Sequence, residues 1–223
     1  MNIQISKWGN SLALRIPQHL LKEANLTEGD FLSASLTPDG TIVLRSKHVD
    51  RKSLIRELHD LRESMSIGKS VIKQLRLSSI LISMIYIDTS VFVALCTREA
   101  KSKAVEVWYE KASGDLISSV WTFTEFASAL AIKERTGQIT SKQSRSAWTL
   151  FEKICSYDVE LLPIKRNVFY SAGLLTLDAK SNLRAGDALH LSAAKEMKSK
   201  LMVTLDKVLA KNSEKVMIKA LVL

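Results

Sequence analysis

The spacing of hydrophobic and polar positions changes twice along the chain and divides it into three parts. In residues 1–47 apolar side chains alternate with polar ones in short runs, which is typical of strands with one buried face. In residues 48–83 they recur three and four positions apart, which predicts an amphipathic helix. From Met84 onward short apolar runs alternate with longer helical stretches, a rhythm that predicts an α/β domain with a mostly parallel sheet.

The first part is predicted to be a small β-rich unit. Turn signals at Gly9-Asn10 and at Pro38-Asp39-Gly40 separate strands that can pair as hairpins, and Pro17 can open a helix. So few short strands bury little apolar surface, and we therefore expect this unit to need a second copy of the chain. The predicted strands are residues 3–5, 12–16, 31–36 and 41–45, and the predicted helix is residues 18–24.

The middle part is predicted to be mainly helical. Leu54, Ile55, Leu58 and Leu61 lie at helical spacing with charged residues between them. A second short helix is predicted at 71–77, followed by a short join at 78–83. Such a segment could serve as a linker, a dimer contact or an arm that docks on a partner.

The last part is predicted to alternate strands and helices. Met84–Ile87 is too short an apolar run for a helix and is typical of a buried parallel strand. Further strands are expected at 116–119, 159–164, 201–204 and 216–223. Helices are expected at 91–97, 102–112, 122–135, 141–156, 167–179, 187–198 and 206–211.

Composition and charge fit a globular protein with polyanionic partners. Apolar residues make up 46% and charged residues 25% of the 223 residues, so wholesale disorder is not expected. The net charge of +9 is shared, because residues 1–83 carry 12 basic and 8 acidic residues and residues 84–223 carry 20 and 15. Cys96 and Cys155 have no disulfide or zinc-site spacing, so we expect reduced thiols. With no signal peptide and no membrane-length apolar run, we expect a soluble cytoplasmic protein without a membrane partner.

Four acids occupy equivalent places in the predicted domain. Asp88 and Asp206 follow strands, whereas Glu125 and Asp187 lie in the first turns of helices. Each has a structural explanation, because Asp88, Asp187 and Asp206 can be helix N-caps and Thr122 with Glu125 can form a capping box. For one acid alone capping is the better explanation. Four acids at the strand ends of one sheet favour a shared acidic pocket.

Such a pocket predicts a hard metal ion. Clustered carboxylates raise one another's pKa and destabilise a fold unless a cation neutralises them. Oxygen ligands select Mg²⁺ or Mn²⁺ over zinc, and a metal held this way suits phosphodiester hydrolysis. The four histidines are scattered without ligand spacing, so we assign them no metal role: His19, His48, His59 and His190.

The first part resembles the AbrB/MazE family in three motifs, Lys7–Pro17, Leu26–Asp30 and Gly40–Leu44. The resemblance implies a dimer with exchanged hairpins that binds operator DNA, commonly as the antitoxin of a toxin–antitoxin pair. The implied DNA contacts are Lys7, Asn10, Ser11 and Arg15, of which the two basic residues can bind phosphate and the two polar residues phosphate or base edges. Alternatively, Lys7 and Arg15 only solvate a hairpin, but the whole motif favours DNA contact.

The last part resembles the PIN-domain ribonucleases, specifically VapC toxins, in four motifs that occur in family order: Met84–Ser90, Thr124–Leu130, Arg184–Ala194 and Val203–Ala210. The resemblance implies a Mg²⁺-dependent endoribonuclease with Asp88, Glu125, Asp187 and Asp206 as catalytic metal ligands. It also implies polar positions near the metal at Thr204 and at Thr89 or Ser90. In VapB antitoxins the segment after the DNA-binding unit wraps the toxin, and an arginine can enter the acidic site. By position, Arg62 and Arg76 are the candidates.

Together these features favour a toxin–antitoxin fusion that cleaves RNA, binds operator DNA and forms a homodimer or higher oligomer. Its expected parts are a DNA-binding domain at 1–47, a helical arm and linker at 48–83, and a PIN domain at 84–223. One alternative is a DNA-binding regulator whose PIN-like domain only dimerises. Another is a phosphatase or DNA nuclease with the same metal chemistry, since carboxylate-bound Mg²⁺ alone does not select RNA.

Overall fold

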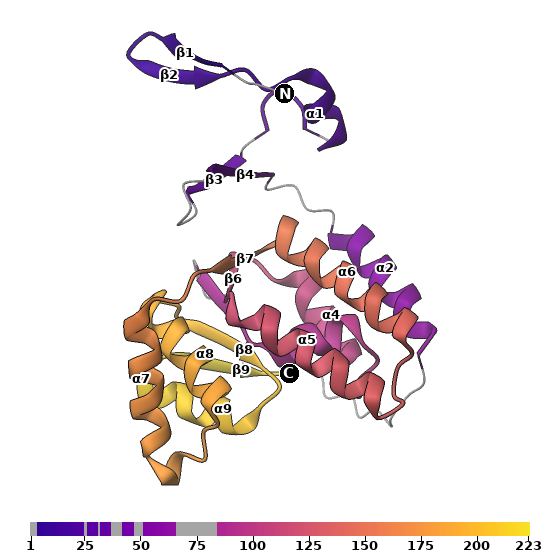
Figure 1. The fold of residues 1–223 in the computed structure, drawn as a ribbon, viewed down its shortest axis with the longest axis vertical. Coiled ribbons are helices and arrows are strands. Elements are labelled where there is room, and N and C mark those ends of the chain that lie inside the picture. Colours follow the sequence, from indigo (N-terminus) through magenta and orange to yellow (C-terminus); the bar gives the residue numbers. More distant parts are fainter. Residues whose placement is uncertain (1–3, 25, 31, 37–41, 47–50, 66–83) are drawn as a thin grey trace. The chain divides into compact units, whose positions relative to one another are not determined.

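The computed structural model describes residues 4–24, 26–30, 32–36, 42–46, 51–65 and 84–223. The chain divides into two compact units, Met1–Val49 and Asp50–Leu223 (Figure 1). None of the helices in the described ranges is long and apolar enough to cross a membrane.

The first unit contains two antiparallel hairpins and a short helix, as predicted. In the first hairpin Ile5 pairs with Leu14 and Trp8 with Ser11, and Gly9 supplies the positive φ of 58° that the tight turn requires. The elements are β1 (Ile5–Trp8), β2 (Ser11–Leu14), α1 (Gln18–Glu23), β3 (Leu32–Leu36) and β4 (Ile42–Ser46).

This first unit exposes much of its apolar surface. The side chains of Trp8 and Leu12 are 78% and 75% exposed, and Ile5 is 62% exposed. Helix α1 buries none of its residues. Apolar surface left uncovered on this scale is typical of a protein that associates through it.

The second unit is built on a five-stranded sheet, in the order β7-β6-β5-β8-β9, with every neighbouring pair parallel. The predicted α/β fold with a parallel sheet flanked by helices is therefore confirmed. The chain starts in the centre at β5, runs outward through β6 and β7, and returns to the other side for β8 and β9. The strands are β5 (Met84–Ile87), β6 (Asp115–Ser119), β7 (Val159–Leu162), β8 (Leu201–Thr204) and β9 (Lys219–Val222).

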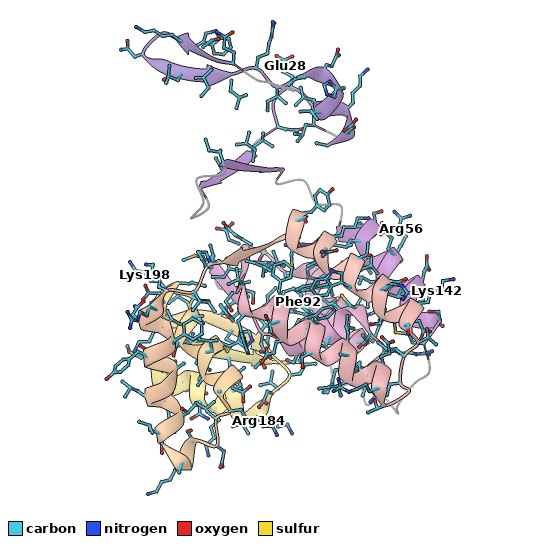
Figure 2. The ribbon with its side chains drawn as sticks, viewed as in Figure 1. Glu28, Arg56, Phe92, Lys142, Arg184 and Lys198 are labelled. Carbon is cyan, nitrogen blue, oxygen red and sulfur yellow. The ribbon has the colours of Figure 1, made fainter. Side chains whose placement is uncertain are left out.

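Helices pack on the sheet, and the core between them contains more than one cluster (Figures 1 and 2). Tyr86 packs with Ala172 and Leu189 in one cluster. Elsewhere in the unit Phe92, Phe126 and Phe151 form a second, aromatic cluster, in which the last two rings stack at 4.2 Å between centroids. The helices are α3 (Thr89–Cys96), α4 (Ser102–Lys111), α5 (Trp121–Arg135), α6 (Ser141–Tyr157), α7 (Arg166–Leu177), α8 (Ala185–Glu196) and α9 (Lys207–Ser213).

Two strands are shorter than predicted. The prediction carried β7 to residue 164, but it ends at Leu162 because Pro163 has no N–H for the ladder. The prediction began the last strand at residue 216. A 3₁₀ turn, Glu214–Val216, and the left-handed Met217, with φ of 63°, delay β9 until Lys219.

Helix α2 (Arg51–Glu63), predicted from its apolar spacing, belongs to the second unit and packs against α3, α4 and α6. Leu58 is fully buried and Leu54 almost so. The predicted helix at 71–77 and the join at 78–83 lie outside the described residues.

Candidate metal site

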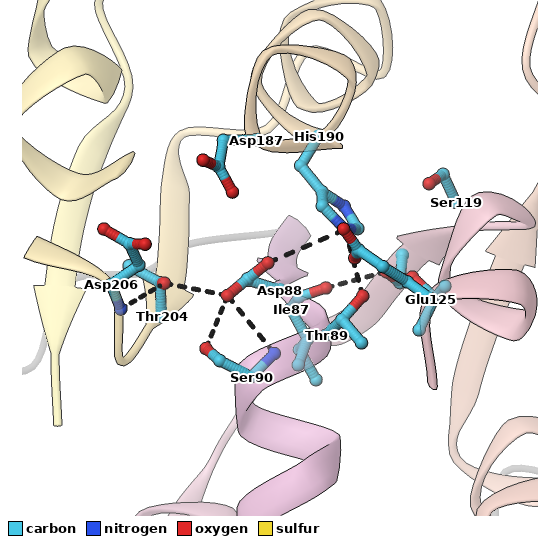
Figure 3. Close-up of polar contacts among 12 residues, drawn as sticks. Ile87, Asp88, Thr89, Ser90, Ser119, Glu125, Asp187, His190, Thr204 and Asp206 are labelled. Carbon is cyan, nitrogen blue, oxygen red and sulfur yellow. Dashed lines mark hydrogen bonds and ion pairs between the residues drawn. The ribbon is translucent and has the colours of Figure 1, made fainter. Parts of the chain in front are cut away.

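The four acids converge at the carboxyl edge of the parallel sheet (Figure 3). Strands β5 and β8 are neighbours, and the amide of Asp88 donates to the carbonyl of Val203 at 3.0 Å. The residues after these strands, Asp88 and Asp206, therefore lie next to each other. Asp187 comes from the first turn of α8, and Glu125 lies one turn inside the N-terminal end of α5. This is the edge at which the strand order reverses, where open α/β sheets bind ligands.

Asp88 is 5% exposed and is held by hydroxyl groups. Its Oδ2 accepts hydrogen bonds from Thr204 Oγ1 at 2.9 Å and from both the amide and the hydroxyl of Ser90. Thr204 and Ser90, the polar positions implied by the family resemblance, thus orient this carboxylate. The other oxygen, Oδ1, lies 3.6 Å from His190 Nε2.

Asp206 and Asp187 also make helix-end contacts. Asp206 is the N-cap of α9 and accepts from the amides of Val208 and Leu209 at 2.6 and 3.0 Å, both through Oδ1. Asp187 lies in the third position of α8, where its Oδ2 accepts from the amide of Arg184 at 3.2 Å. Capping and membership of an acidic site are therefore compatible, because each capping contact uses one oxygen of a carboxylate.

The pKa of Asp187 reports how close the acids are. Burial raises its pKa above the ordinary 3.8, the amide of Arg184 lowers it, and the negative charges of the three other acids raise it further. A carboxyl group perturbed by three like charges at a strand edge is typical of a functional site.

Glu125 does not take part in a capping box. Thr122 lies inside α5 rather than at its N-cap, and its hydroxyl bonds to Ser118 Oγ at 2.8 Å. Glu125 Oε2 instead lies 2.7 Å from His190 Nε2. Burial alone would raise the pKa of Glu125, but His190 lowers it overall. The capping-box explanation for this acid is therefore wrong.

His190 also lies at the site, although the scattered spacing of the histidines in the sequence predicts no role for any of them there. Its side chain is 1% exposed, and its Nδ1 lies 2.8 Å from the hydroxyl of Tyr86. Burial would lower its pKa, but Tyr86 and the two nearby acids raise it well above the ordinary value of 6.5. A signal for this placement exists in the sequence, since residues three positions apart, as Asp187 and His190 are, share one face of a helix.

The donor atoms fit a divalent cation. One ligand atom from each of Asp88, Glu125 and His190 lies within 4.8 Å of the other two. Asp187 and Asp206 add carboxylates beside them. A set dominated by carboxylate oxygens suits Mg²⁺ or Mn²⁺.

Arg62 does not reach the acidic site. Its guanidinium forms a buried ion pair with Glu106 on α4 and bonds the carbonyl of Ser102. A second ion pair, between Arg51 and Asp158 at 2.8 Å, holds the start of α2. The proposal that Arg62 enters the acidic site is thus wrong, and Arg76 lies outside the described residues.

The four expected DNA contacts are all exposed and lie along the first hairpin of the other unit. Lys7 is on β1, Asn10 is in the turn, Ser11 opens β2 and Arg15 follows it. The hairpin thus presents two cationic and two polar side chains to solvent.

Comparison with known proteins identifies two segments. The PIN domain family matches residues 85–215, which are 131 of the 223 residues. The bacterial antitoxin family described as "Antidote-toxin recognition MazE" matches residues 5–52. The sequence matches no curated protein.

Two solved structures are similar to part of the chain. The first is the VapC20 toxin of Mycobacterium tuberculosis, described as cleaving the sarcin–ricin loop, with 15% identity, a TM-score of 0.48, and coverage of 57% of this chain and 93% of that one. The second is VapBC2 of Rickettsia felis bound to a DNA fragment from its promoter, with 13% identity, a TM-score of 0.44, and coverage of 62% and 97%.

Proposed function

This chain belongs to the PIN-domain family, and with a MazE-type antitoxin segment ahead of that domain we propose that it is a VapBC-type toxin–antitoxin fusion with a Mg²⁺-dependent endoribonuclease. The observation that carries this proposal is the convergence of four carboxylates at the carboxyl edge of the sheet. We propose that the protein is cytoplasmic, because the RNA that it would cleave and the operator DNA that it would bind are found together in that compartment.

Asp88, Glu125, Asp187 and Asp206 would hold the metal in this proposal. Bound there, Mg²⁺ or Mn²⁺ supplies a Lewis acid that activates water and stabilises charge on the phosphate. The protein's own residues fix the carboxylates beforehand. Thr204 donates to Asp88 Oδ2 and accepts from the amide of Asp206 at 2.9 Å, so it ties two of the acids together.

The test is cleavage of a mixed RNA pool by the wild type, Asp88→Asn and Asp187→Asn, each measured intact and after nicking at a protease site inserted within 66–83, so that inhibition by the arm does not mask activity. We expect Mg²⁺-dependent cleavage that EDTA abolishes and that neither variant performs, while circular dichroism shows both folded. Full activity in both variants would refute the site assignment. If the folded wild type neither cleaves RNA nor gives a heat of Mg²⁺ binding by calorimetry, the DNA-binding regulator with a dimerising PIN-like domain becomes the better account. Cleavage of DNA but not RNA would favour the DNA nuclease.

We propose that residues 1–47 bind operator DNA as a dimer with exchanged hairpins. The exposed apolar side chains of Ile5, Trp8 and Leu12 support association with a second copy of the chain, because the first hairpin of a single copy leaves them uncovered. Lys7 and Arg15 would contact phosphates, while Asn10 and Ser11 would reach phosphates or base edges.

We propose that residues 48–83 are an inhibitory antitoxin arm, because α2 is anchored on the PIN domain by two ion pairs and buried leucines. A tether keeps such an arm at high effective concentration. The test compares RNA cleavage by the full chain, by the fragment 84–223, and by a chain nicked at a protease site inserted within 66–83, which retains α2. Cleavage only after removal or nicking supports inhibition by the arm. Equal cleavage by all three refutes it.

A further inference from the structure

The carboxylate of Glu125 has a neighbour at each of its two oxygens. Oε2 lies 2.7 Å from His190 Nε2 (Figure 3). The other oxygen, Oε1, rests directly against Gly186, where the Cβ of any other residue would clash with it. Glu125 comes from α5, whereas Gly186 and His190 both come from α8, beside Asp187. Helix α8 therefore contacts Glu125 at two points.

Hydroxyl groups of neighbouring residues hold the His190 ring in place. The Tyr86 hydroxyl lies 2.8 Å from Nδ1 and 3.0 Å from Ser119 Oγ, and Tyr86 is fully buried. Nε2 also lies 3.0 Å from Thr89 Oγ1. Because the Glu125 carboxylate can only accept a hydrogen bond, Nε2 carries the proton that it donates to Glu125, and the Tyr86 hydroxyl, which donates to Ser119 Oγ, accepts from Nδ1.

Gly186 has no conformational need to be a glycine. It lies in the first turn of α8, and its φ is not in the left-handed region. An alanine there would be favoured in a helix. What excludes a methyl group is the position of Glu125 Oε1. Since that atom is the end of a flexible side chain, an added methyl displaces the carboxylate at little cost to the fold.

We propose that His190 and Gly186 are positioning residues that together set where the Glu125 carboxylate meets the metal, an inference that rests on the proposed nuclease function. His190 holds one oxygen by a hydrogen bond, and Gly186 leaves the space in which the other oxygen sits. Tyr86 orients the imidazole for this purpose. A merely structural His190 would need no contact with Glu125, and a helix-forming position would not need glycine.

His190 as a metal ligand is the competing assignment. A ligand must offer the lone pair of Nε2 to the ion. In this structure Nε2 faces a carboxylate oxygen and a hydroxyl at hydrogen-bond distance, so the proton occupies that position. The two assignments differ in what glutamine does at position 190, because its amide can donate a hydrogen bond to Glu125 but is a poor replacement for an imidazole ligand.

The experiment measures Mg²⁺ affinity by calorimetry in the full chain and, separately, RNA cleavage by the full chain before and after nicking within 66–83. Gly186→Ala, His190→Ala, His190→Gln and Tyr86→Phe are compared with two controls. Gly173→Ala places the same methyl group in α7, where nothing lies within 4 Å, and His59→Gln changes an exposed histidine. Thermal unfolding checks that each variant is folded.

We expect Gly186→Ala and His190→Ala to lower Mg²⁺ affinity or turnover by roughly 10- to 100-fold, the range seen when groups that orient metal ligands are removed. His190→Gln should recover part of the loss, Tyr86→Phe should show a smaller loss, and the controls should match the wild type. Wild-type affinity and turnover in both folded Gly186→Ala and His190→Ala would overturn the proposal.

Two further results separate the inference from the function on which it rests. If the wild type binds Mg²⁺ but neither the intact nor the nicked chain cuts RNA, the proposed function fails, and the affinities of the variants still decide the inference. If His190→Gln is as impaired as His190→Ala and Mn²⁺ bound to the wild type shows magnetic coupling to an imidazole nitrogen, His190 is a ligand and the positioning role is refuted.

Discussion

Replacing Arg62 with methionine should weaken the docking of helix α2 on the PIN domain. The side chains of Arg62 and Glu106 are 6% and 8% exposed, so their ion pair is buried. Methionine keeps most of the apolar volume and removes the charge. The variant therefore leaves Glu106 buried without its main partner, and this is the costly way to break such a pair.

The size of the effect follows from burial. Removing one partner of a buried ion pair costs about 3–5 kcal/mol. Lys103 Nζ remains 2.7 Å from Glu106, but its side chain is 61% exposed, and exposed pairs contribute at most about 1 kcal/mol. We therefore expect a loss of about 3 kcal/mol, or roughly a 100-fold rise in the population with α2 undocked.

Hydrogen exchange of the α2 amides, followed by mass spectrometry, measures this opening. The control is Lys153→Ala on the same helix interface, because Lys153 and Glu57 form an ion pair that is 40% and 45% exposed. It should change protection by less than about fivefold, as exposed pairs do. The double variant Arg62→Met/Glu106→Gln should regain protection, since neither buried charge remains. If Arg62→Met is as well protected as Lys153→Ala, the ion pair does not anchor the arm.

The same anchor should weaken in acid. Burial would raise the pKa of Glu106, but Lys103 and Arg62 lower it below the ordinary 4.5. A depressed pKa in the folded state means that the ion pair's stabilisation is fully present above about pH 4.5 and is lost as the pH falls through the folded-state value. The difference in α2 protection between the wild type and Glu106→Gln should therefore be constant at neutral pH and shrink below pH 4.5.

Two further predictions concern the two proposed activities. Thr204→Val should lower RNA cleavage roughly 10- to 100-fold because it removes the hydroxyl that orients Asp88, whereas Thr204→Ser should stay near wild type; equal rates in the two variants would contradict this role. Lys7→Ala and Arg15→Ala should each weaken operator binding and reduce the slope of log affinity against log salt by about one, measured by fluorescence anisotropy, and an unchanged slope would remove the residue from the phosphate contacts.

The sequence predicted the sheet and the four acids because both depend on local patterns. Met84–Ile87 is a buried run, and each acid sits where such a run ends or a helix begins. Parallel pairing then brings these ends together. Apolar spacing extends the predicted strands over Pro163 and Met217 because it does not register a missing N–H or a left-handed residue.

The supporting residues of the site were harder to predict, because their roles depend on contacts between distant elements. His190 reaches Glu125 across 65 positions of sequence, and Tyr86 reaches His190 across 104. In the sequence, Tyr86 is only one more residue of the apolar run that predicts a buried strand, and nothing in that run indicates a partner for its hydroxyl group. Gly186 gave no turn signal, since its function depends on an oxygen that α5 brings to α8.

The position of Arg62 shows that docking of α2 on the PIN domain and inhibition of the acidic site are separate questions. The anchor of α2 is on α4, through Glu106 and Ser102, whereas the acidic site is built from strand ends and the N-terminal parts of α3, α5, α8 and α9. An arm that inhibits must therefore do so through residues beyond the anchor or by excluding RNA from the surface. Arg62→Met distinguishes these roles, because undocking α2 should raise RNA cleavage only if inhibition depends on the anchor. If the variant has exposed α2 amides and unchanged cleavage, docking and inhibition are independent.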